Sequence, residues 1–264
     1  MLQSMGRSIV SRVFRGTFDS IFRPSQFVRV NYHALEGSLW SKFRQIIQLV
    51  VIFVANLSAY ALPLTIAGFG TVPNVEQLPI LASLSTSEEV RFILRFAQNS
   101  LYLTGAAGAT FIAFHAGVLL TRSSQGILSS LHTVTYSTSG YLAAIFSFVV
   151  YIQTSNQLSQ TADFLIWFQV AFVYRIIDML GANLVLEGVE RVGEMPSQGL
   201  SPLGQVLIAG LLIACSYYVY SLYLGSRLNH NTSRTTATLT VLAVLSTPIF
   251  FVIASVIAVT GFGM

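Results

Sequence analysis

Two long apolar runs joined by a short polar turn constrain this chain more than any other feature. They lie within residues 101–151 and flank the turn Arg122-Ser123-Ser124-Gln125-Gly126. Each run is long enough to supply the roughly 20 apolar residues that an α-helix needs to cross a bilayer. The pair therefore predicts a hairpin of two membrane-spanning helices.

The composition places the whole chain in the membrane class. Of its 264 residues, 53% are hydrophobic and only 9% are charged, whereas soluble globular proteins carry about 25% charged residues. The net charge of +4 comes without a dense basic patch interleaved with aromatic residues, so it does not indicate nucleic acid binding. The one cysteine, Cys215, lies in an apolar run and excludes an intrachain disulfide.

The apolar pattern along the chain predicts an all-α, polytopic membrane helix bundle with six spans. Residues 1–44 are predicted to form an arm outside the bundle, and residues 45–264 to form the bundle itself. Pro63 is expected to kink the first span. The predicted spans cover residues 45–69, 97–121, 127–152, 162–184, 203–224 and 237–259.

The N-terminal arm has the pattern of an amphipathic helix at the membrane surface. At 100° per residue its apolar side chains gather on one side, and Arg7, Arg12 and Arg15 gather on the other. Such a helix lies in the headgroup region, with its arginines toward anionic lipid. The alternative is an organelle transit peptide, because arginine-rich segments poor in acidic residues have that composition too.

The second predicted span carries small residues at a strict four-residue spacing. The stripe consists of Gly105, Ala109, Ala113 and Gly117. Small residues let the backbone of a neighbouring helix approach closely. The sequence therefore predicts a tight helix-packing face inside the bundle, in preference to a pore lining or a homodimer seam.

Several polar residues are predicted to meet within the bundle near the turn of the hairpin. His115 and His132 lie at about the same distance from that turn, and Tyr136 follows one turn after His132. Arg175 and Asp178 share one face of the fourth predicted span and fall in the same leaflet. Ionisable groups at this depth pair within the protein. We favour a structural hydrogen-bond network over a functional site; the functional alternatives are a proton-handling pair, a ligand pocket and a lipid-headgroup contact.

No sequence motif points to catalysis or to a cofactor. The chain contains no GxSxG, no HExxH, no phosphate-binding loop and no dinucleotide-binding glycine pattern after a strand. Two histidines with one nearby carboxylate are too few for a closed metal site. We therefore predict a non-enzymatic protein without a cofactor or a bound metal.

The distribution of basic residues predicts the orientation. With six spans, nine basic residues lie on one side of the membrane, against Arg91, Arg227 and Arg234 on the other. The positive-inside bias then places both termini on the cytoplasmic or matrix side. The prokaryotic plasma membrane is the predicted location, with the mitochondrial inner membrane as the alternative.

Five short stretches carry a resemblance to known membrane proteins. They are Phe22-Arg23-Pro24-Ser25-Gln26-Phe27, Phe114-His115-Ala116-Gly117-Val118-Leu119-Leu120, Thr133-Val134-Thr135-Tyr136-Ser137-Thr138-Ser139, Ile166-Trp167 and Leu186-Glu187-Gly188-Val189-Glu190. Together they resemble the prokaryotic form of the Yip family, membrane proteins named for their interaction with Ypt/Rab GTPases. The chain departs from the family at Gly140, where the family has proline, and in a sixth predicted span beyond the usual five. The eukaryotic Asp-Pro-Tyr-Gly-Pro element is absent.

The resemblance implies a membrane-organising or partner-binding protein whose partners are the lipid bilayer and other membrane proteins. One alternative hypothesis is an accessory transmembrane subunit of a respiratory or photosynthetic complex. A second alternative is a small-solute or proton transporter that uses His115, His132 and Asp178.

Overall fold

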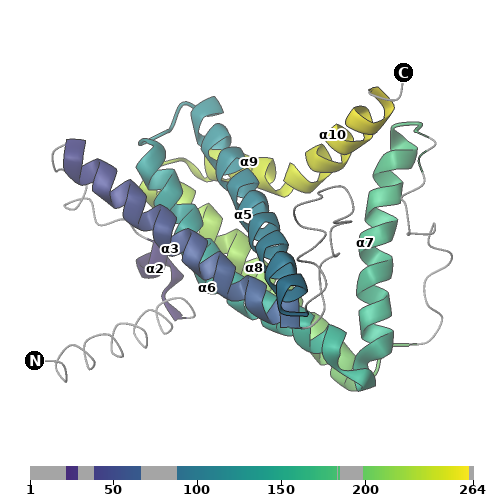
Figure 1. Ribbon diagram of the computed structural model, residues 1–264. Coiled ribbons are helices and arrows are strands. Elements are labelled where there is room, and N and C mark those ends of the chain that lie inside the picture. The colour runs from purple at the N-terminus through teal and green to yellow at the C-terminus, as the bar shows by residue number, and fades with distance from the viewer. Residues whose placement is uncertain (1–21, 29–38, 67–87, 183, 185–198, 262–264) are drawn as a thin grey trace, which may run out of the picture.

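The computed structural model describes residues 22–28, 39–66, 88–182, 184 and 199–261. Within these ranges the chain is helical and contains no strand, which confirms the predicted helical class. Arg7, Arg12 and Arg15 of the predicted surface arm lie outside the described residues. Figure 1 shows the described helices: α2 (Pro24–Val28), α3 (Leu39–Ile66), α5 (Glu88–Leu120), α6 (Ile127–Thr154), α7 (Ser159–Met179), α8 (Pro202–Asn229), α9 (Arg234–Leu245) and α10 (Thr247–Gly261).

Among the described residues, five segments are long and apolar enough to cross a membrane, in agreement with the predicted membrane class. They are Leu49–Ile66, Glu88–Leu120, Ile127–Thr154, Pro202–Asn229 and Arg234–Ile257. The fourth predicted span, residues 162–184, corresponds to α7, which is not one of the five. Helix α7 contains Asp163, Arg175 and Asp178 within its 21 residues.

The helix that contains the first span begins before the predicted span. Helix α3 starts at Leu39 and continues without a break through residue 45, so the predicted boundary between arm and bundle falls inside a helix. Pro63 lies within α3. The missing N–H of this proline removes one hydrogen bond of the last turns.

Helices α6 and α8 form an antiparallel pair, and two glycines of α8 allow their close approach. A Cβ atom at Gly225 would overlap Thr133 near the start of α6. A Cβ atom at Gly210 would lie 2.8 Å from the Phe148 ring, in the second half of α6. Leu207 packs with Ile152 still further along α6. In these successive contacts the residue numbers increase along α6 and decrease along α8. The last turn of α6 and the first turn of α8 therefore lie at the same end of the pair.

The segment that connects α6 to α8 therefore begins and ends at the same end of this helix pair. Helix α7 begins beside the start of α8, because a Cβ atom at Gly204 would overlap Thr161 Oγ1. The start of α8 is well defined: the Ser201 hydroxyl accepts a hydrogen bond from the N–H of Gly204 at 3.1 Å, and Pro202 occupies the first turn.

Helix α3 packs across α5 and α6, and polar side chains set its register. Asn56 donates a hydrogen bond to Ser139 Oγ at 2.8 Å, and the Tyr60 hydroxyl donates to the Ser139 carbonyl at 2.6 Å. Near the other end of α3, Asn99 donates to Thr65 Oγ1 at 2.9 Å. The bond between Asn99 and Thr65 joins the last turn of α3 to the first part of α5, and Figure 1 shows that the two helices run in opposite directions.

The sixth predicted span, residues 237–259, is broken into two helices. Helix α9 ends at Leu245 and α10 begins at Thr247, with a change of direction between them (Figure 1). Pro248 explains the break, because it has no N–H for the carbonyl of Val244 and its ring crowds that carbonyl. Helix α10 then packs on α7 through Val252 and Val256.

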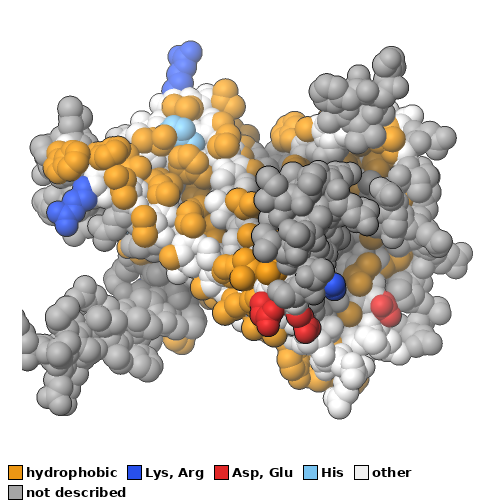
Figure 2. All heavy atoms as spheres, in the orientation of Figure 1, with side chains coloured by type: hydrophobic (Ala, Val, Ile, Leu, Met, Phe, Trp, Pro, Cys, Tyr) orange, Lys and Arg blue, Asp and Glu red, His pale blue; other side chains and the backbone are white. Residues whose placement is uncertain are grey.

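The two ends of the helix bundle differ in charge. Arg44, Arg122, Arg227 and Arg234 lie toward the end at which α5 and α8 end and α3, α6 and α9 begin, and we name this the basic end. At the opposite end α5 begins with Glu88 and Glu89, and Arg91 follows them. Figure 2 shows Asp and Glu side chains toward one end of the molecule, with a Lys or Arg side chain beside them, and further Lys and Arg side chains toward the other end. Arg227 and Arg234 thus share an end with Arg122, whereas the six-span prediction placed them on opposite sides.

Candidate functional site

The basic end contains a buried polar cluster in which two histidines are joined through one serine. Ser130 Oγ lies 2.9 Å from His115 Nδ1 and 3.1 Å from His230 Nε2. Ser130 is fully buried, His230 is 1% exposed, and His115 is half-buried. The three residues come from α6, from the residue that follows α8, and from α5.

A backbone donor fixes the protonation state of His230. The N–H of Gln125, in the hairpin turn, donates to His230 Nδ1 at 3.0 Å. Because a backbone N–H can only donate, Nδ1 is an acceptor and the ring proton of the neutral histidine lies on Nε2. The Nε2–H group therefore donates to Ser130 Oγ, which leaves the Ser130 hydroxyl proton for His115 Nδ1. The result is a directed chain of hydrogen bonds from the turn to His115.

Burial keeps His230 neutral. The pKa of His230 is lowered from 6.5 to about 4, first by desolvation on burial and second by the neighbouring His115. Protonation of Nδ1 would place two N–H groups face to face at Gln125. The ring of Phe114 packs beside that of His230, with centroids 5.9 Å apart.

A second set of hydrogen bonds holds the short helix α2 at the same end. The side-chain amide of Asn229 donates to the carbonyl of Val28 at 2.9 Å and to Thr133 Oγ1 at 2.8 Å. The Thr133 hydroxyl in turn donates to the carbonyl of Ser129 at 2.9 Å. Val28 is fully buried. A part of the predicted N-terminal arm therefore packs on the bundle.

The predicted polar cluster divides in the structure. His115 joins Ser130 and His230 as described above. His132 stacks on Tyr136 one turn later on α6, with ring centroids 4.2 Å apart and planes inclined by 20°. His132 is partly buried, whereas Tyr136 is exposed on the side of α6.

Arg175 and Asp178 are not brought to the histidines. Both are exposed on α7, whose buried residues Tyr174, Ile176 and Ile177 pack against α10. Figure 1 shows α7 standing apart from the end of α5 that carries His115. The physical reason is the antiparallel α6–α8 pair, which directs α7 away from the basic end.

The predicted packing stripe on α5 also divides. Gly117 contacts α9 closely, since a Cβ atom there would lie 3.0 Å from Thr240 Cα. Ala109 and Ala113 are partly buried. Gly105 is exposed, and a Cβ atom there would meet nothing within 4 Å.

His230, Ser130 and Gln125 were missed as site residues. Ser130 is one of many hydroxyl residues in the third predicted span, and His230 lies in a link that the six-span prediction assigned to the opposite side. The signal that could have found His230 is its position beside Asn229 at the end of an apolar run, with Arg227 and Arg234 on either side.

Within the described part of the chain, no group of three or more His, Cys, Asp or Glu side chains could hold a metal ion. Chemically, the cluster can fix the register of α5, α6 and α8, and it can pass a proton between His230 and His115. Comparisons of the chain with models of protein families, with curated proteins and with solved structures found no match.

Proposed function

We propose that this chain is a non-enzymatic integral membrane protein that acts by assembling with other membrane proteins, as the resemblance to the Yip family implies. The observation that carries the proposal is the outward half of the small-residue stripe on α5. Gly105 is exposed with open space around it, and the neighbouring Gly108 also has nothing within 4 Å of a Cβ position. Small residues on an outward helix face allow a second helix to pack closely.

The exposed surface of the spans supports the same proposal. Each of the five spans buries between 22% and 33% of its residues within the chain. Most residues of every span therefore keep some surface that the chain itself does not bury, and lipid and neighbouring helices can contact that surface. At the basic end Ser130 bonds to His115 and His230, and Asn229 bonds to Thr133, which is the pattern of a register-fixing network.

Purification from native membranes in mild detergent tests this function. We expect a complex larger than the 28.8 kDa chain. Gly105→Leu should reduce the complex to the single chain, because a leucine would keep a partner helix away. Ala55→Leu, at another exposed small residue in α3, is the matched control and should leave the complex intact. Recovery of the wild-type chain alone would contradict the proposal. Co-purified respiratory or photosynthetic subunits would instead favour the accessory-subunit alternative.

We propose further that the chain crosses the membrane five times, in place of the six spans predicted. The support is that the segment between α6 and α8 begins and ends at one end of that pair, so α7 makes no net crossing. Five spans place the basic end, with the start of α3, on the cytoplasmic side of a prokaryotic plasma membrane or the matrix side of a mitochondrial inner membrane. Residue 264 then lies on the opposite side. A reporter fused after Met264 should be active only there; activity on the basic side would contradict this topology.

Proton or small-solute transport is the second candidate, and the hydrogen-bonded chain of His230, Ser130 and His115 favours it. Hydroxyl and imidazole groups in series can relay a proton. Proteoliposomes containing the protein would then show a proton flux that Ser130→Ala reduces strongly. Flux that is unchanged in Ser130→Ala would remove this cluster from any transport role.

A further inference from the structure

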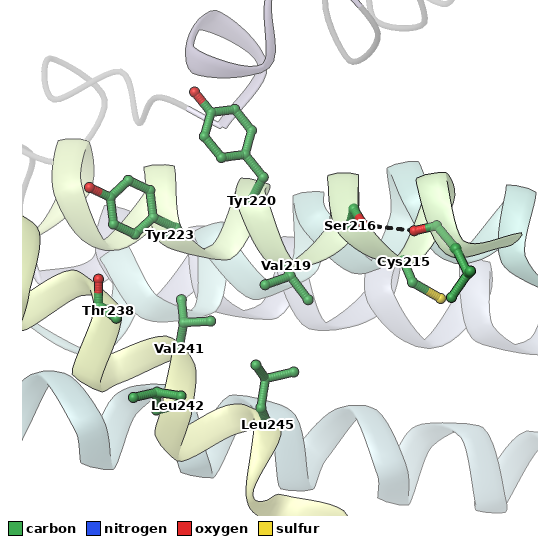
Figure 3. A pocket seen from close by; sticks show the side chains of 10 residues that line it. Cys215, Ser216, Val219, Tyr220, Tyr223, Thr238, Val241, Leu242 and Leu245 are labelled. Atoms are coloured by element: carbon green, nitrogen blue, oxygen red, sulfur yellow. Dashed lines mark hydrogen bonds between the residues drawn. The ribbon is translucent and has the colours of Figure 1, made fainter. Parts of the chain in front are cut away.

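An outward-facing groove runs between α8 and α9 on the side of the bundle. Its volume is about 520 Å³, within the usual range for ligand sites. Most of its lining is apolar, including Val219, Val241 and Leu242. Figure 3 shows the Tyr223 and Thr238 hydroxyls at one end of the groove and Cys215 at the other. The Ser216 hydroxyl near Cys215 donates to the carbonyl of Leu212 at 2.8 Å within α8, so the phenol groups of Tyr220 and Tyr223 mark the more polar end of the groove.

The groove has the depth of one membrane leaflet. It extends along α8 from Leu212 to Tyr223, about 16 Å at 1.5 Å per residue. This is about half of the ~30 Å hydrocarbon core. Its polar end points toward the basic end, because α8 runs toward His230. Leu212 and Leu242 are more than half exposed, so the groove opens to the side where lipid lies.

Two arginines stand one helical turn beyond the polar end of the groove. Arg227 follows Tyr223 by four residues on α8, and Arg234 precedes Thr238 by four residues on α9, so each shares a face with its groove residue. Neither α8 nor α9 contains an acidic residue. Arg234 also begins α9, where the helix dipole disfavours a cation unless an anion is near.

Aromatic rings complete the arrangement. The rings of Tyr220 and Tyr223 stack with centroids 6.3 Å apart and an angle of 15° between their planes. Tyrosines at this level typically lie where the acyl chains meet the headgroups. The order along the groove is thus apolar, then phenolic, then cationic, which matches the order of groups in one phospholipid.

We propose that this groove binds one acyl chain of an anionic phospholipid, whose phosphate is held by Arg227 and Arg234. The apolar lining takes the chain, and the tyrosines cover its upper part. Specificity for an anionic headgroup comes from the two guanidinium groups, which form strong charge-assisted hydrogen bonds with phosphate. This site is independent of the proposed assembly function and stands if no protein partner is found.

Cys215 provides a direct test, because the only cysteine of the chain lines the inner end of the groove. The full chain in dodecyl maltoside micelles is alkylated with N-ethylmaleimide while dioleoylphosphatidylglycerol or dioleoylphosphatidylcholine is added. We expect both lipids to slow the alkylation of Cys215, but phosphatidylglycerol should do so at a mole fraction roughly 100-fold lower than phosphatidylcholine. The factor follows from a gain in affinity of about tenfold for each guanidinium group that contacts the phosphate. Inorganic phosphate should give no protection.

Charge variants identify the headgroup site. R227Q/R234Q should raise the phosphatidylglycerol requirement to that of phosphatidylcholine, whereas R227K/R234K should keep most of the preference and show that the fold is intact. R44Q/R91Q removes the same charge elsewhere and should leave the preference unchanged. Equal protection by the two lipids in the wild-type protein, protection by phosphate alone, or an equal loss in R44Q/R91Q would each overturn the proposal.

Discussion

Among glycine-to-alanine replacements at the described glycines, Gly225→Ala should destabilise the protein most. The new Cβ atom would overlap Thr133 Cγ2 and would lie 2.9 Å from Thr133 Oγ1 and 3.0 Å from Thr133 Cβ. Relief requires α6 and α8 to move apart, and overpacking of this kind costs about 1–3 kcal/mol. The movement also weakens the hydrogen bond from Asn229, one turn further on α8, to Thr133 Oγ1, which adds about 1 kcal/mol.

A double-mutant cycle isolates this contact. Thr133→Ser removes Cγ2 but keeps the hydroxyl, so alone it should cost about 1 kcal/mol for the lost methyl group. In the Gly225→Ala background it should restore stability, with a coupling of about 1–2 kcal/mol. The measurement is the free energy of unfolding in mixed micelles. Gly105→Ala is the control and should be neutral or slightly stabilising, since its Cβ meets nothing. Wild-type stability in Gly225→Ala, or the absence of coupling, would refute the proposed packing of α6 on α8.

Three further predictions concern the basic end and the start of α8. Unfolded His230 titrates near pH 6.5 and folded His230 near pH 4, so the unfolded state binds more protons between these values and stability falls as the pH decreases through this window. The free energy of unfolding should decrease by about 3 kcal/mol, at about 1.4 kcal/mol per pKa unit, and unfolding experiments at several pH values measure this decrease. His230→Gln should remove most of the pH dependence. An equal pH dependence in that variant would contradict the assignment. Asn229→Ala should cost about 1–3 kcal/mol and accelerate hydrogen exchange around Val28, so unchanged exchange there would disprove the anchoring of α2. Gly204→Ala should lower the unfolding temperature whereas Gly199→Ala, which has open space, should not; the same temperature for both would contradict the close contact of α7 and α8.

The individual helices could be predicted well from hydropathy. The hairpin of α5 and α6 and the first part of α8 agree with the predicted spans to within a few residues at most of their ends, because a membrane helix must be long and apolar. The break at Ser246 was missed although Pro248 signals it. Residues 237–259 are apolar throughout, and hydropathy alone does not register a bend.

The candidate site could be predicted only in part, and α7 is the reason. Its apolar face gave it the pattern of a span. Counting it as one assigns everything that follows to the side opposite to that in the proposed five-span topology. His230 was thereby assigned to the side opposite Arg122. The positions of Arg227 and Arg234 carry the missing signal, because placing them beside Arg122 makes the basic residues more one-sided. What hydropathy cannot supply is the pairing of α6 with α8, which depends on the fit of Gly225 and Gly210 to individual side chains.

The proposed five-span topology depends on the two ends of the α7 segment facing the same side of the membrane. Single cysteines placed at Asn156 and Gly199, both exposed, in a Cys215→Ser background can be labelled with a membrane-impermeant maleimide in sealed, oriented vesicles. Gln125→Cys in the hairpin turn marks the basic side. The account predicts that positions 156 and 199 react from the same side and that position 125 reacts from the other. Labelling of positions 156 and 199 from opposite sides would contradict it and would restore α7 as a sixth span.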